Sequence, residues 1–267
     1  MNYKKVISNY LRIFRLLFFV DKVRFVIQKL KNRKPNKDFK SLHPSVILPP
    51  DYLMYESFQL NYNKFYSDSH ETAKWLCNHF AKHIELHNVK ILDWGCGPGR
   101  VIRHLPDVTD GTCEFYGTDY NSQSIRWCSE NLKGIRFNKN NINASLPYQD
   151  NYFDVIYGIS IFTHLSEQLH YDWYNELYRV LKPDGIMFFT TQGDNAVEKL
   201  TKAELITFNK GELVVRGKVK EGHRTYSAFH PNPFILKLFK NVSILEHIAL
   251  PRGNTNVIPQ DIWILRK

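Results

Sequence analysis

The feature that most constrains the fold of this chain is an alternation of short apolar runs with longer amphipathic segments. Strands separated by helices of ten or more residues form parallel sheets with helices on both faces. Helical spacing is found at residues 122–132 and 167–181, and a further helix is expected to begin at residue 99. The alternation therefore predicts an α/β fold. Its five expected strands are residues 89–95, 113–120, 135–141, 152–162 and 185–193.

The loop after the first expected strand reads "DWGCGPG" and has glycines at positions 95, 97 and 99. In open α/β sheets the ligand lies beyond the carboxyl ends of the strands, so this loop is a candidate binding site. The spacing differs from the G-x-G-x-x-G of dinucleotide-binding loops, and no G-K-[ST] ending follows. Asp93, two residues before the first glycine, would repel a phosphate and suits a ligand that carries a cationic ammonium group.

Asp119 stands at the end of the second expected strand. A carboxylate at this position can accept hydrogen bonds from both hydroxyls of a ribose, and the neighbouring Tyr120 could stack on a base. Together with the glycine loop, these residues indicate a nucleoside that carries a positively charged tail without a phosphate. S-adenosylmethionine meets that description.

Residues 89–191 resemble the class I S-adenosylmethionine-dependent methyltransferases. Four motifs follow one another in the order and spacing of that family: "ILDWGCGPGR", "YGTDYNSQSI", "NNINASLPYQDNYFDVIYGISIFTHL" and "ELYRVLKPDGIMFFTT". The resemblance implies a Rossmann-like doubly wound sheet of seven strands with the last strand antiparallel. Residues 242–250 and 256–267 are placed to form the final pair of strands. The resemblance also implies methyltransferase activity with S-adenosylmethionine as cofactor.

The same resemblance implies which residues contact the cofactor. The three glycines would pass under its methionine part, and Asp119 would bind the ribose hydroxyls. Asn141 stands where the family often has an aspartate at the adenine amino edge, and its amide oxygen can still accept a hydrogen bond there. The full set of expected contacts is Asp93, Gly95, Cys96, Gly97, Gly99, Asp119, Tyr120, Asn141, Ile142 and Ile159.

Two histidines are the candidate catalytic residues. A hydroxyl acceptor usually needs a base to take its proton. In the family the catalytic groups tend to lie just after the fourth strand, where this chain has His164. His230 is the second candidate, because it lies in the long connection at residues 192–233 that is expected to cover the substrate. The unperturbed pKa of histidine suits a base at neutral pH, and the alternative is that His164 only shapes the pocket.

Several acceptors and ligands are disfavoured. The chain lacks the [DNS]-P-P-[YFW] segment of nucleic-acid amino-methyltransferases, and no cysteine suits carbon-5 methylation of pyrimidines, so no nucleic-acid partner is expected. No acidic cluster indicates a divalent metal. The cysteines form no C-x-x-C pair and are interpreted as thiols rather than as zinc ligands or disulfides. They are Cys77, Cys96, Cys113 and Cys128.

The formal charge of +10 is concentrated at the N-terminus, because residues 1–40 hold twelve basic and only two acidic side chains. On a helical wheel, residues 4–18 separate into a basic face and an apolar face, and Asp21 is expected to cap a second short helix that ends near Lys31. Such a helix suits the headgroup region of an anionic membrane. We therefore expect contact with a membrane surface through residues 4–31. The alternatives are packing on protein and an RNA-binding arm.

The expected organisation has three parts. Residues 1–40 form a basic amphipathic extension, residues 41–88 a linker and a cap helix, and residues 89–267 the methyltransferase domain. The linker is expected because prolines recur at positions 35, 44, 49 and 50 of residues 33–51. Within residues 41–88, helical spacing is clearest from residue 68 onward.

A narrower resemblance, in segments such as "LPPDYLMYES" and "QDIWILRK", is to a bacterial subgroup associated with surface-polysaccharide and other glycan pathways. It implies an O-methyltransferase for a sugar hydroxyl or a phosphate-linked group of a membrane-associated glycan. The enzyme would be cytoplasmic and bound peripherally to the inner face of the cell membrane. The alternatives are methyl transfer to a lipid, a quinone or another small hydrophobic metabolite, and a non-catalytic cofactor-binding subunit of a complex. The oligomeric state stays open.

Overall fold

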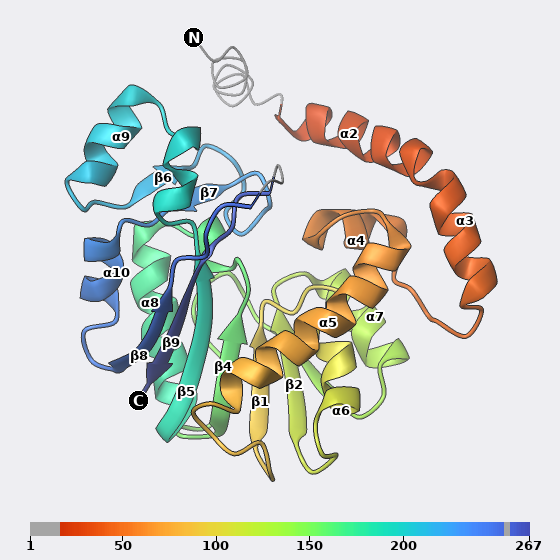
Figure 1. Cartoon of the computed structure of the whole chain (residues 1–267), viewed down its shortest axis with the longest axis horizontal. Helices are drawn as coiled ribbons and strands as arrows, with labels where there is room; N and C mark the ends of the chain where they lie inside the picture. Colours follow the sequence, from red (N-terminus) through yellow and green to blue (C-terminus); the bar gives the residue numbers. More distant parts are fainter. Residues whose placement is uncertain (1–16, 254–256) are drawn as a thin grey trace. The chain divides into compact units, whose positions relative to one another are not determined.

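The structure is a computed structural model, and it describes residues 17–253 and 257–267 (Figure 1). The amphipathic helix expected at residues 4–18 therefore falls almost wholly outside the described residues. The chain divides into two compact units. We call residues 18–140 the first unit and residues 141–267 the second unit.

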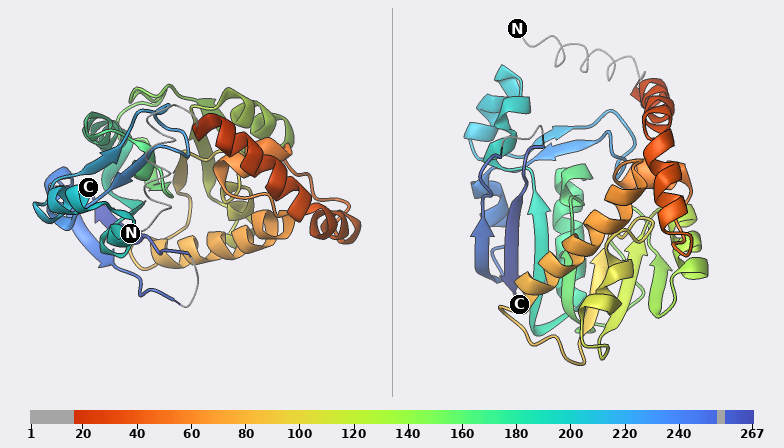
Figure 2. Two further views of the ribbon diagram at one scale, coloured as in Figure 1. Left: turned by 90° about the horizontal axis from the view of Figure 1, so that it is seen from above. Right: turned by 45° about the vertical axis from the view of Figure 1, so that its right-hand side comes forward.

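Three parallel strands form the sheet of the first unit. They are β1 (Lys90–Trp94), β2 (Glu114–Asp119) and β3 (Ile135–Lys139), with β2 in the middle. Most residues of β1 and β2 are buried, because helices cover both faces of these strands. Figures 1 and 2 show α5 on one face of the strands and α7 on the other. These helices span Tyr62–Phe80 and Ser122–Asn131.

Three further helices of the first unit precede the strands. They are α2 (Leu17–Lys31), α3 (Arg33–Leu42) and α4 (Asp51–Ser57). Phe39 of α3 is buried in a cluster with Met54, Tyr55 and Phe65. Among the described residues, no helix is both long enough and apolar enough to cross a membrane.

The expected linker is wrong over residues 33–42, which form α3. Pro35 lies in the first turn of this helix, where backbone N–H groups have no partner within the helix, so its ring does not interrupt the hydrogen bonding. The boundary expected between residues 40 and 41 therefore lies inside a helix. Asp21 is not a helix cap, since it lies within α2 and its Oδ1 accepts a hydrogen bond from the Tyr55 hydroxyl at 2.8 Å.

Two other helices differ from expectation. The cap helix begins at Tyr62, earlier than the clearest helical spacing indicated, and Asn61 caps it by accepting a hydrogen bond from the backbone N–H of Lys64. The helix expected after the glycine loop is short. It consists of a 3-10 turn, η1 (Ile102–His104), followed by a single turn, α6 (Leu105–Val108).

The sheet of the second unit contains both strand directions. Strand β4 is parallel to β5, β5 is antiparallel to β9, and β9 is antiparallel to β8. The complete strand order is β3-β2-β1-β4-β5-β9-β8, which confirms the predicted seven-stranded sheet with an antiparallel last strand. The strands span Phe153–Gly158 (β4), Leu181–Thr191 (β5), Ser243–Ile248 (β8) and Asp261–Arg266 (β9). Helix α8 (Glu167–Val180) packs against β5, and α10 (Asn232–Leu238) packs against α8.

The expected cover at residues 192–233 has secondary structure and a small core of its own. Its strands β6 (Val214–Arg216) and β7 (Ser227–Phe229) pair in an antiparallel two-stranded sheet. Their apolar side chains pack with those of η3 (Asp194–Lys199) and α9 (Lys202–Asn209). The buried members of this core are Ala196, Leu200, Phe208, Val214 and Phe229.

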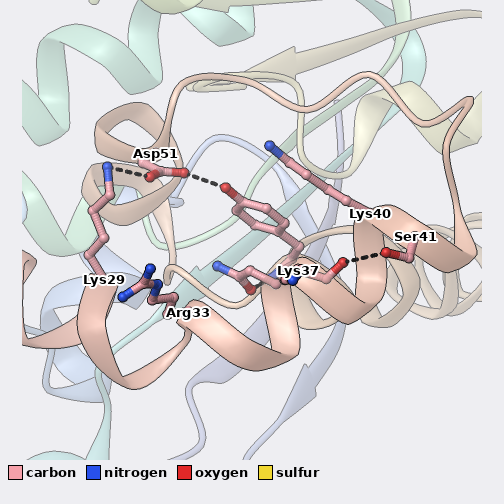
Figure 3. Close-up of a pocket in the computed structure, with 8 residues that line it drawn as sticks. Lys29, Arg33, Lys37, Lys40, Ser41 and Asp51 are labelled. Carbon is pink, nitrogen blue, oxygen red and sulfur yellow. Dashed lines mark hydrogen bonds and ion pairs between the residues drawn. The ribbon is translucent and has the colours of Figure 1, made fainter.

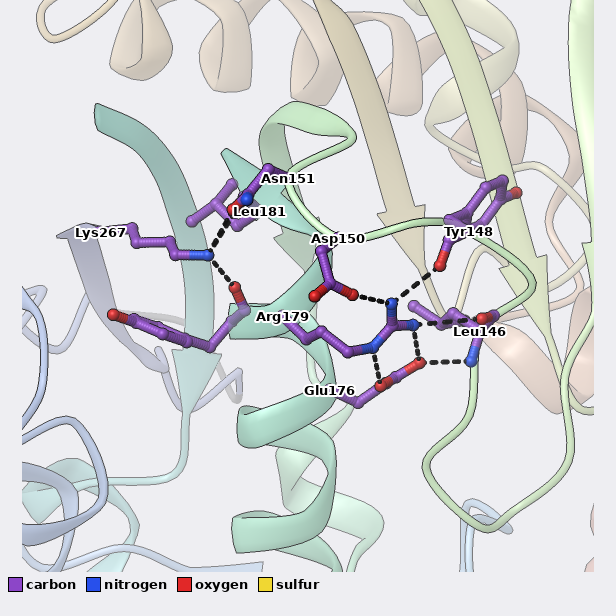
Figure 4. Close-up of polar contacts among 9 residues, drawn as sticks. Leu146, Tyr148, Asp150, Asn151, Glu176, Arg179, Leu181 and Lys267 are labelled. Atoms are coloured by element: carbon purple, nitrogen blue, oxygen red, sulfur yellow. Dashed lines mark hydrogen bonds and ion pairs between the residues drawn. The ribbon is translucent and has the colours of Figure 1, made fainter. Parts of the chain in front are cut away.

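Polar contacts fix the loop before β4 to α8 (Figure 4). The Arg179 guanidinium donates to the carbonyl of Tyr148 at 2.9 Å, to Asp150 Oδ1 at 2.7 Å and to both carboxylate oxygens of Glu176. Close to this network, the C-terminal Lys267 donates from Nζ to the carbonyls of Tyr178 and Leu181, each at 2.7 Å. These bonds satisfy carbonyls at the end of α8, which the helix leaves without partners.

Candidate functional site

The glycine loop of the first unit adopts a conformation that side chains would oppose. Gly95, Gly97 and Gly99 have φ values of 78°, 52° and 71°. A Cβ atom on Gly99 would lie 2.5 Å from Leu132 Cδ1, so the position excludes even alanine without displacement. The backbone N–H groups of residues 95 and 96 both donate to the carbonyl of Thr118, at 2.8 and 3.0 Å. The loop is thereby fixed against the carboxyl end of β2.

Asp119, the last residue of β2, connects this loop to the next helix. Its Oδ2 accepts a hydrogen bond from the backbone N–H of Gly97 at 2.9 Å, and its Oδ1 accepts one from Asn121 at 2.7 Å. Burial raises the pKa of Asp119, and these two N–H groups oppose the rise. Each carboxylate oxygen has a second lone pair, so the arrangement can still accept the two hydroxyls of a ribose.

The buried asparagine beside this carboxylate is Asn140 rather than Asn141. Asn140 Oδ1 accepts a hydrogen bond from Thr118 Oγ1 at 2.8 Å, and its backbone N–H donates to the carbonyl of Asp119 at 3.1 Å. Asn141 is exposed, and Ile142 is half-buried with its carbonyl accepting from Trp173 Nε1 at 2.9 Å. Both belong to the second unit, as does the half-buried Ile159. Cofactor contacts of these three residues stay predictions.

Two other expected contacts have buried or half-buried side chains. Asp93 is buried on β1, and Tyr120 is half-buried after β2. Burial raises the pKa of the Tyr120 phenol, and the nearby carboxylates of Asp119 and Glu56 raise it further. Tyr120 therefore remains a neutral ring beside the loop, as a stacking role requires.

Two thiols donate hydrogen bonds to the glycine loop. Cys96 Sγ and Cys128 Sγ both donate to the carbonyl of Gly97, at 3.5 and 3.6 Å. Burial raises the pKa of both thiols, so they stay protonated at neutral pH. A protonated thiol is a poor nucleophile, and these cysteines therefore act as packing groups.

Residues of α4 and α5 reach the same loop, although sequence reasoning assigned none of them to the site. Ser57 lies so close that a Cβ atom on Gly97 would be 3.3 Å from its Cβ. Glu56 Oε2 accepts a hydrogen bond from Asn121 Nδ2 at 3.1 Å. Arg100 donates to Ser69 Oγ at 2.9 Å and lies over the Phe58 ring at 4.2 Å. These contacts join segments far apart in sequence, and no local pattern indicates them.

In the second unit, His164 lies in η2 (Phe162–His164), directly after β4. Its Nδ1 is 2.8 Å from the carbonyl of Tyr226, which can only accept, so Nδ1 carries the proton and donates. Burial lowers the pKa of His164, and the ring is neutral at pH 7. Within the described residues no hydrogen bond engages Nε2, which leaves a lone pair free to accept a proton.

His230 lies in the interior of the second unit, with 1% of its surface exposed. Its Nδ1 accepts from the backbone N–H of Gln192 at 3.3 Å, so the proton is on Nε2, which donates to His170 Nε2 at 2.9 Å. His170 in turn donates from Nδ1 to the carbonyl of Ser166 at 2.7 Å. Both ring nitrogens of His230 are occupied, which argues against its expected contact with substrate.

A strained serine lies between β4 and His164. Ser160 has φ of 64°, a conformation that costs energy for a residue with a side chain and is concentrated at functional sites. Its Oγ and Thr190 Oγ1 both donate to Gln260 Oε1, at 2.8 and 2.6 Å. These polar groups come from the carboxyl ends of β4 and β5 and from the residue before β9. Among the described residues, no group of histidines, cysteines and carboxylates could hold a metal ion.

Comparison with known proteins agrees with this arrangement. Residues 91–185 match the family model for a methyltransferase domain. The matched region contains the glycine loop, Asp119, Ser160 and His164. A crystal structure of a SAM-dependent methyltransferase from Methanosarcina mazei has a TM-score of 0.55 at 22% identity and covers 71% of this chain and 96% of that one. This likeness establishes the fold.

Curated relatives match over shorter lengths. Sterol 24-C-methyltransferase erg6 of Schizosaccharomyces pombe is 27% identical over 127 residues, which are 45% of this chain and 32% of the relative. Malonyl-[acyl-carrier protein] O-methyltransferase of Enterobacter lignolyticus is 28% identical over 114 residues, 43% of each chain. The chain thus spans less than half the length of these two relatives.

Proposed function

We propose that this chain, whose residues 91–185 match the methyltransferase domain family, transfers a methyl group from S-adenosylmethionine to a hydroxyl oxygen. The acceptor class that we propose is a membrane-associated glycan, modified on a sugar hydroxyl or a phosphate-linked group. The observation that carries the choice of an oxygen is a neutral His164 whose Nε2 has no hydrogen bond to any residue that the structure describes. Nitrogen and sulfur acceptors can react without a base, whereas a hydroxyl must lose its proton.

The first unit supplies the groups that would hold the cofactor. Asp119 accepts the ribose hydroxyls, and the bare backbone of residues 95–99 lets the methionine part approach closely. When bound, S-adenosylmethionine supplies a methyl group on a positively charged sulfur. Asp93 adds a buried carboxylate at the start of the loop, of a sign that favours a cationic ligand.

The second unit supplies the proton acceptor. The bond from His164 Nδ1 to the Tyr226 carbonyl fixes the tautomer and the ring orientation, so that Nε2 can take the proton of the acceptor hydroxyl. Because burial lowers the pKa of His164, this nitrogen stays unprotonated at neutral pH. The hydroxyls of Ser160 and Thr190 and the amide of Gln260 offer hydrogen bonds to a polar acceptor.

The first unit also carries features suited to a membrane surface. Helix α2 exposes large apolar side chains, including Phe19 at 68% and Leu30 at 66%. The same helix carries lysines and arginines, and its last turn holds Lys29 and Lys31. An exposed apolar face beside basic residues suits an anionic lipid surface. We therefore propose peripheral attachment to the inner face of the cell membrane, beside the acceptor.

A lipid, a quinone or another small hydrophobic metabolite is the second candidate acceptor. The sterol 24-C-methyltransferase among the relatives and the exposed apolar face of α2 favour an acceptor of this class. The polar contacts of Ser160, Thr190 and Gln260 favour the glycan. A non-catalytic cofactor-binding subunit would have no need of the unengaged His164 Nε2.

The deciding experiment offers purified protein, methyl-labelled S-adenosylmethionine and fractionated bacterial lysate. Label is expected in the lipid-linked glycan fraction, and His164→Gln should lower its rate of incorporation while leaving cofactor affinity unchanged. Label in simple lipid would shift the assignment to the second candidate. Cofactor binding without label in any fraction would contradict an enzyme with either of these acceptors.

A further inference from the structure

The first unit contains a pocket of about 400 Å³ that the glycine loop does not share (Figure 3). Four cationic side chains line it: Lys29 at the end of α2, and Arg33, Lys37 and Lys40 along α3. Asp51, at the start of α4, is the one carboxylate in its lining. The pocket therefore has a large excess of positive charge.

Helical geometry explains why these cations converge. Residues 29, 33, 37 and 40 are spaced by four, four and three positions, which keeps them within about 80° of one another around a helix. Asn32 joins α2 to α3 with φ of −95° and ψ of 5°, close enough to helical values to preserve this phase. The cations thus form one row that crosses from α2 into α3.

The helix that carries this row is held firmly to the rest of the unit. Asn36 is buried, donates from Nδ2 to the carbonyl of Leu60 at 3.0 Å, and accepts from the backbone N–H of Tyr62 at 2.9 Å. Asn61 Nδ2 donates to Asn32 Oδ1 at 3.1 Å. The pocket wall is therefore prearranged, which reduces the entropy lost when a ligand binds.

The four cations in the pocket differ in the contacts that they make within the protein. Asp51 pairs with Lys29 at 3.0 Å and accepts from the Tyr62 hydroxyl at 2.6 Å, and Lys40 lies over the Tyr62 ring at 5.3 Å. Within the described residues, the side chains of Arg33 and Lys37 have no ion pair and no hydrogen bond. Figure 3 shows Asp51 between Lys29 on one side and Lys40 on the other. Two cations are thus available to a ligand, with two more close by.

We propose that this pocket binds the phosphate or pyrophosphate group of an anionic ligand. A guanidinium offers paired donors that match phosphate oxygens, and ammonium groups add charge-assisted hydrogen bonds. The ligand is either a phospholipid headgroup or a soluble phosphate compound, which share this chemistry. The proposal goes beyond methyl transfer, since nothing in the pocket depends on the methyl donor or acceptor.

The first test titrates inorganic pyrophosphate into the full chain by calorimetry. The double variant Arg33→Gln and Lys37→Gln should bind at least about tenfold more weakly, because each lost charge-assisted bond contributes a factor of that order. The control is Arg24→Gln with Lys34→Gln, which removes the same charge from α2 and α3 outside the pocket lining. The control should bind within about twofold of the parent protein.

A third variant is expected to gain affinity, which a folding defect cannot imitate. Asp51→Asn keeps an oxygen that accepts from Tyr62, removes the negative charge from the lining and frees Lys29. It should bind pyrophosphate several-fold more tightly than the parent. An unchanged or weaker affinity for Asp51→Asn would contradict the electrostatic basis of the site.

The second test separates the two sources of phosphate with sedimenting vesicles. If the source is lipid, vesicles containing phosphatidic acid should bind the parent and the control, and bind the pocket variant at least about tenfold more weakly. If the source is soluble, pyrophosphate should bind as expected while vesicle binding is equal for the pocket variant and the control. Failure of pyrophosphate to bind, together with equal vesicle binding, overturns the proposal. Both results can be read without any measurement of methyl transfer.

Discussion

At the scale of single residues, Asp119 illustrates how one buried side chain organises a binding loop. Its Oδ2 accepts a hydrogen bond from the backbone N–H of Gly97 in the glycine loop, and its Oδ1 accepts one from the backbone N–H of Asn121. Asn121 extends the same arrangement, because its side chain caps α7 and also donates to Glu56. The carboxylate is therefore structural before any ligand arrives. A variant at Asp119 would therefore change the geometry of the loop as well as the ribose binding that we propose.

Alanine at Gly99 should disturb the loop more than alanine at a matched turn glycine. Gly99→Ala introduces a Cβ 2.5 Å from Leu132 Cδ1 and 3.2 Å from Cys128 Sγ, in addition to an unfavourable φ of 71°. We expect a loss of about 2–4 kcal/mol in the free energy of unfolding. Gly134→Ala has a similar φ of 77° with no atom within 4 Å, and should lose about 1–2 kcal/mol.

Urea unfolding of both glycine variants measures this difference. Binding of S-adenosylhomocysteine by calorimetry should also weaken for Gly99→Ala and stay unchanged for Gly134→Ala. Equal losses of stability in the two variants would mean that the close contacts at Gly99 relax freely.

His164→Gln should slow methyl transfer by about 10²–10⁴-fold, the range in which a general base contributes. The pH profile gives a second readout. Because burial lowers the pKa of His164, the unprotonated form persists below pH 6.5, and the rate for the parent protein should fall only at more acidic pH. The rate of the His164→Gln variant should not show this fall at acidic pH. A variant that keeps the parental rate and profile would show that His164 is not the base.

At the scale of secondary-structure elements, the strands were predictable and the N-terminal helices were only partly so. Strands β1, β2, β4 and β9 are buried apolar runs whose pattern is visible locally, whereas the edge strands β3 and β8 are half-buried or exposed. Helix α3 was missed because its prolyl and charged residues resemble a linker. Its fold depends on Asn36 and Phe39, whose buried partners lie fifteen or more residues away. Tertiary contacts of this kind leave no local pattern.

The Arg179 network should stabilise the second unit far more than an exposed ion pair does. Arg179→Met removes bonds to two backbone carbonyls and two carboxylates, and leaves Glu176 half-buried without its cation. We expect a loss of about 2–4 kcal/mol in the free energy of unfolding. Arg252→Met breaks the exposed pair with Glu198 and should cost less than about 1 kcal/mol. Urea unfolding of both variants would settle the comparison, and equal losses would contradict it.

The paired histidines between α8 and β7 should make the second unit sensitive to acid. Burial lowers the pKa of His170 to about 4 and that of His230 well below 6.5. The unfolded chain therefore binds more protons than the native chain as pH falls from about 6.5 towards 4, and stability falls over that window. Each group contributes a slope of at most about 1.4 kcal/mol per pH unit.

Unfolding free energies between pH 7.5 and 4.5 would test this expectation. The double variant His170→Gln and His230→Gln, which lacks both titrating rings, should show a shallower decline than the parent protein. A parent protein whose stability is constant between pH 6.5 and 4.5 would contradict the assignment of two neutral native rings.

At the scale of the whole molecule, the structure shows where part of the excess of basic residues near the N-terminus lies. Part of the basic excess of residues 1–40 lies on α2 and α3, which pack into the first unit rather than trailing from it. The basic segment is thus partly prearranged by the fold. Sequence alone located the charge, but it could not show which cations share one pocket, because that depends on packing against α4 and α5.

The membrane attachment that we propose should depend on the apolar face of α2 as well as on charge. Phe19→Ser with Leu30→Ser should weaken binding to anionic vesicles by at least about tenfold, since both side chains are more than 60% exposed and available to lipid. The control is Ile206→Ser in α9, which is 61% exposed and lies in the other unit. Vesicle sedimentation measures all three proteins. Equal binding of the double variant and the control would exclude α2 as the lipid contact.

The two thiols that donate to the carbonyl of Gly97 also have a practical consequence. Three of the four cysteines are buried, and Cys113 is the one that is partly exposed. A maleimide dye should therefore label Cys113 first under native conditions and reach the others only on unfolding. The natural chain thus offers one attachment point for a fluorophore, without engineering, and the rate at which Cys96 and Cys128 become reactive would report the opening of the glycine loop.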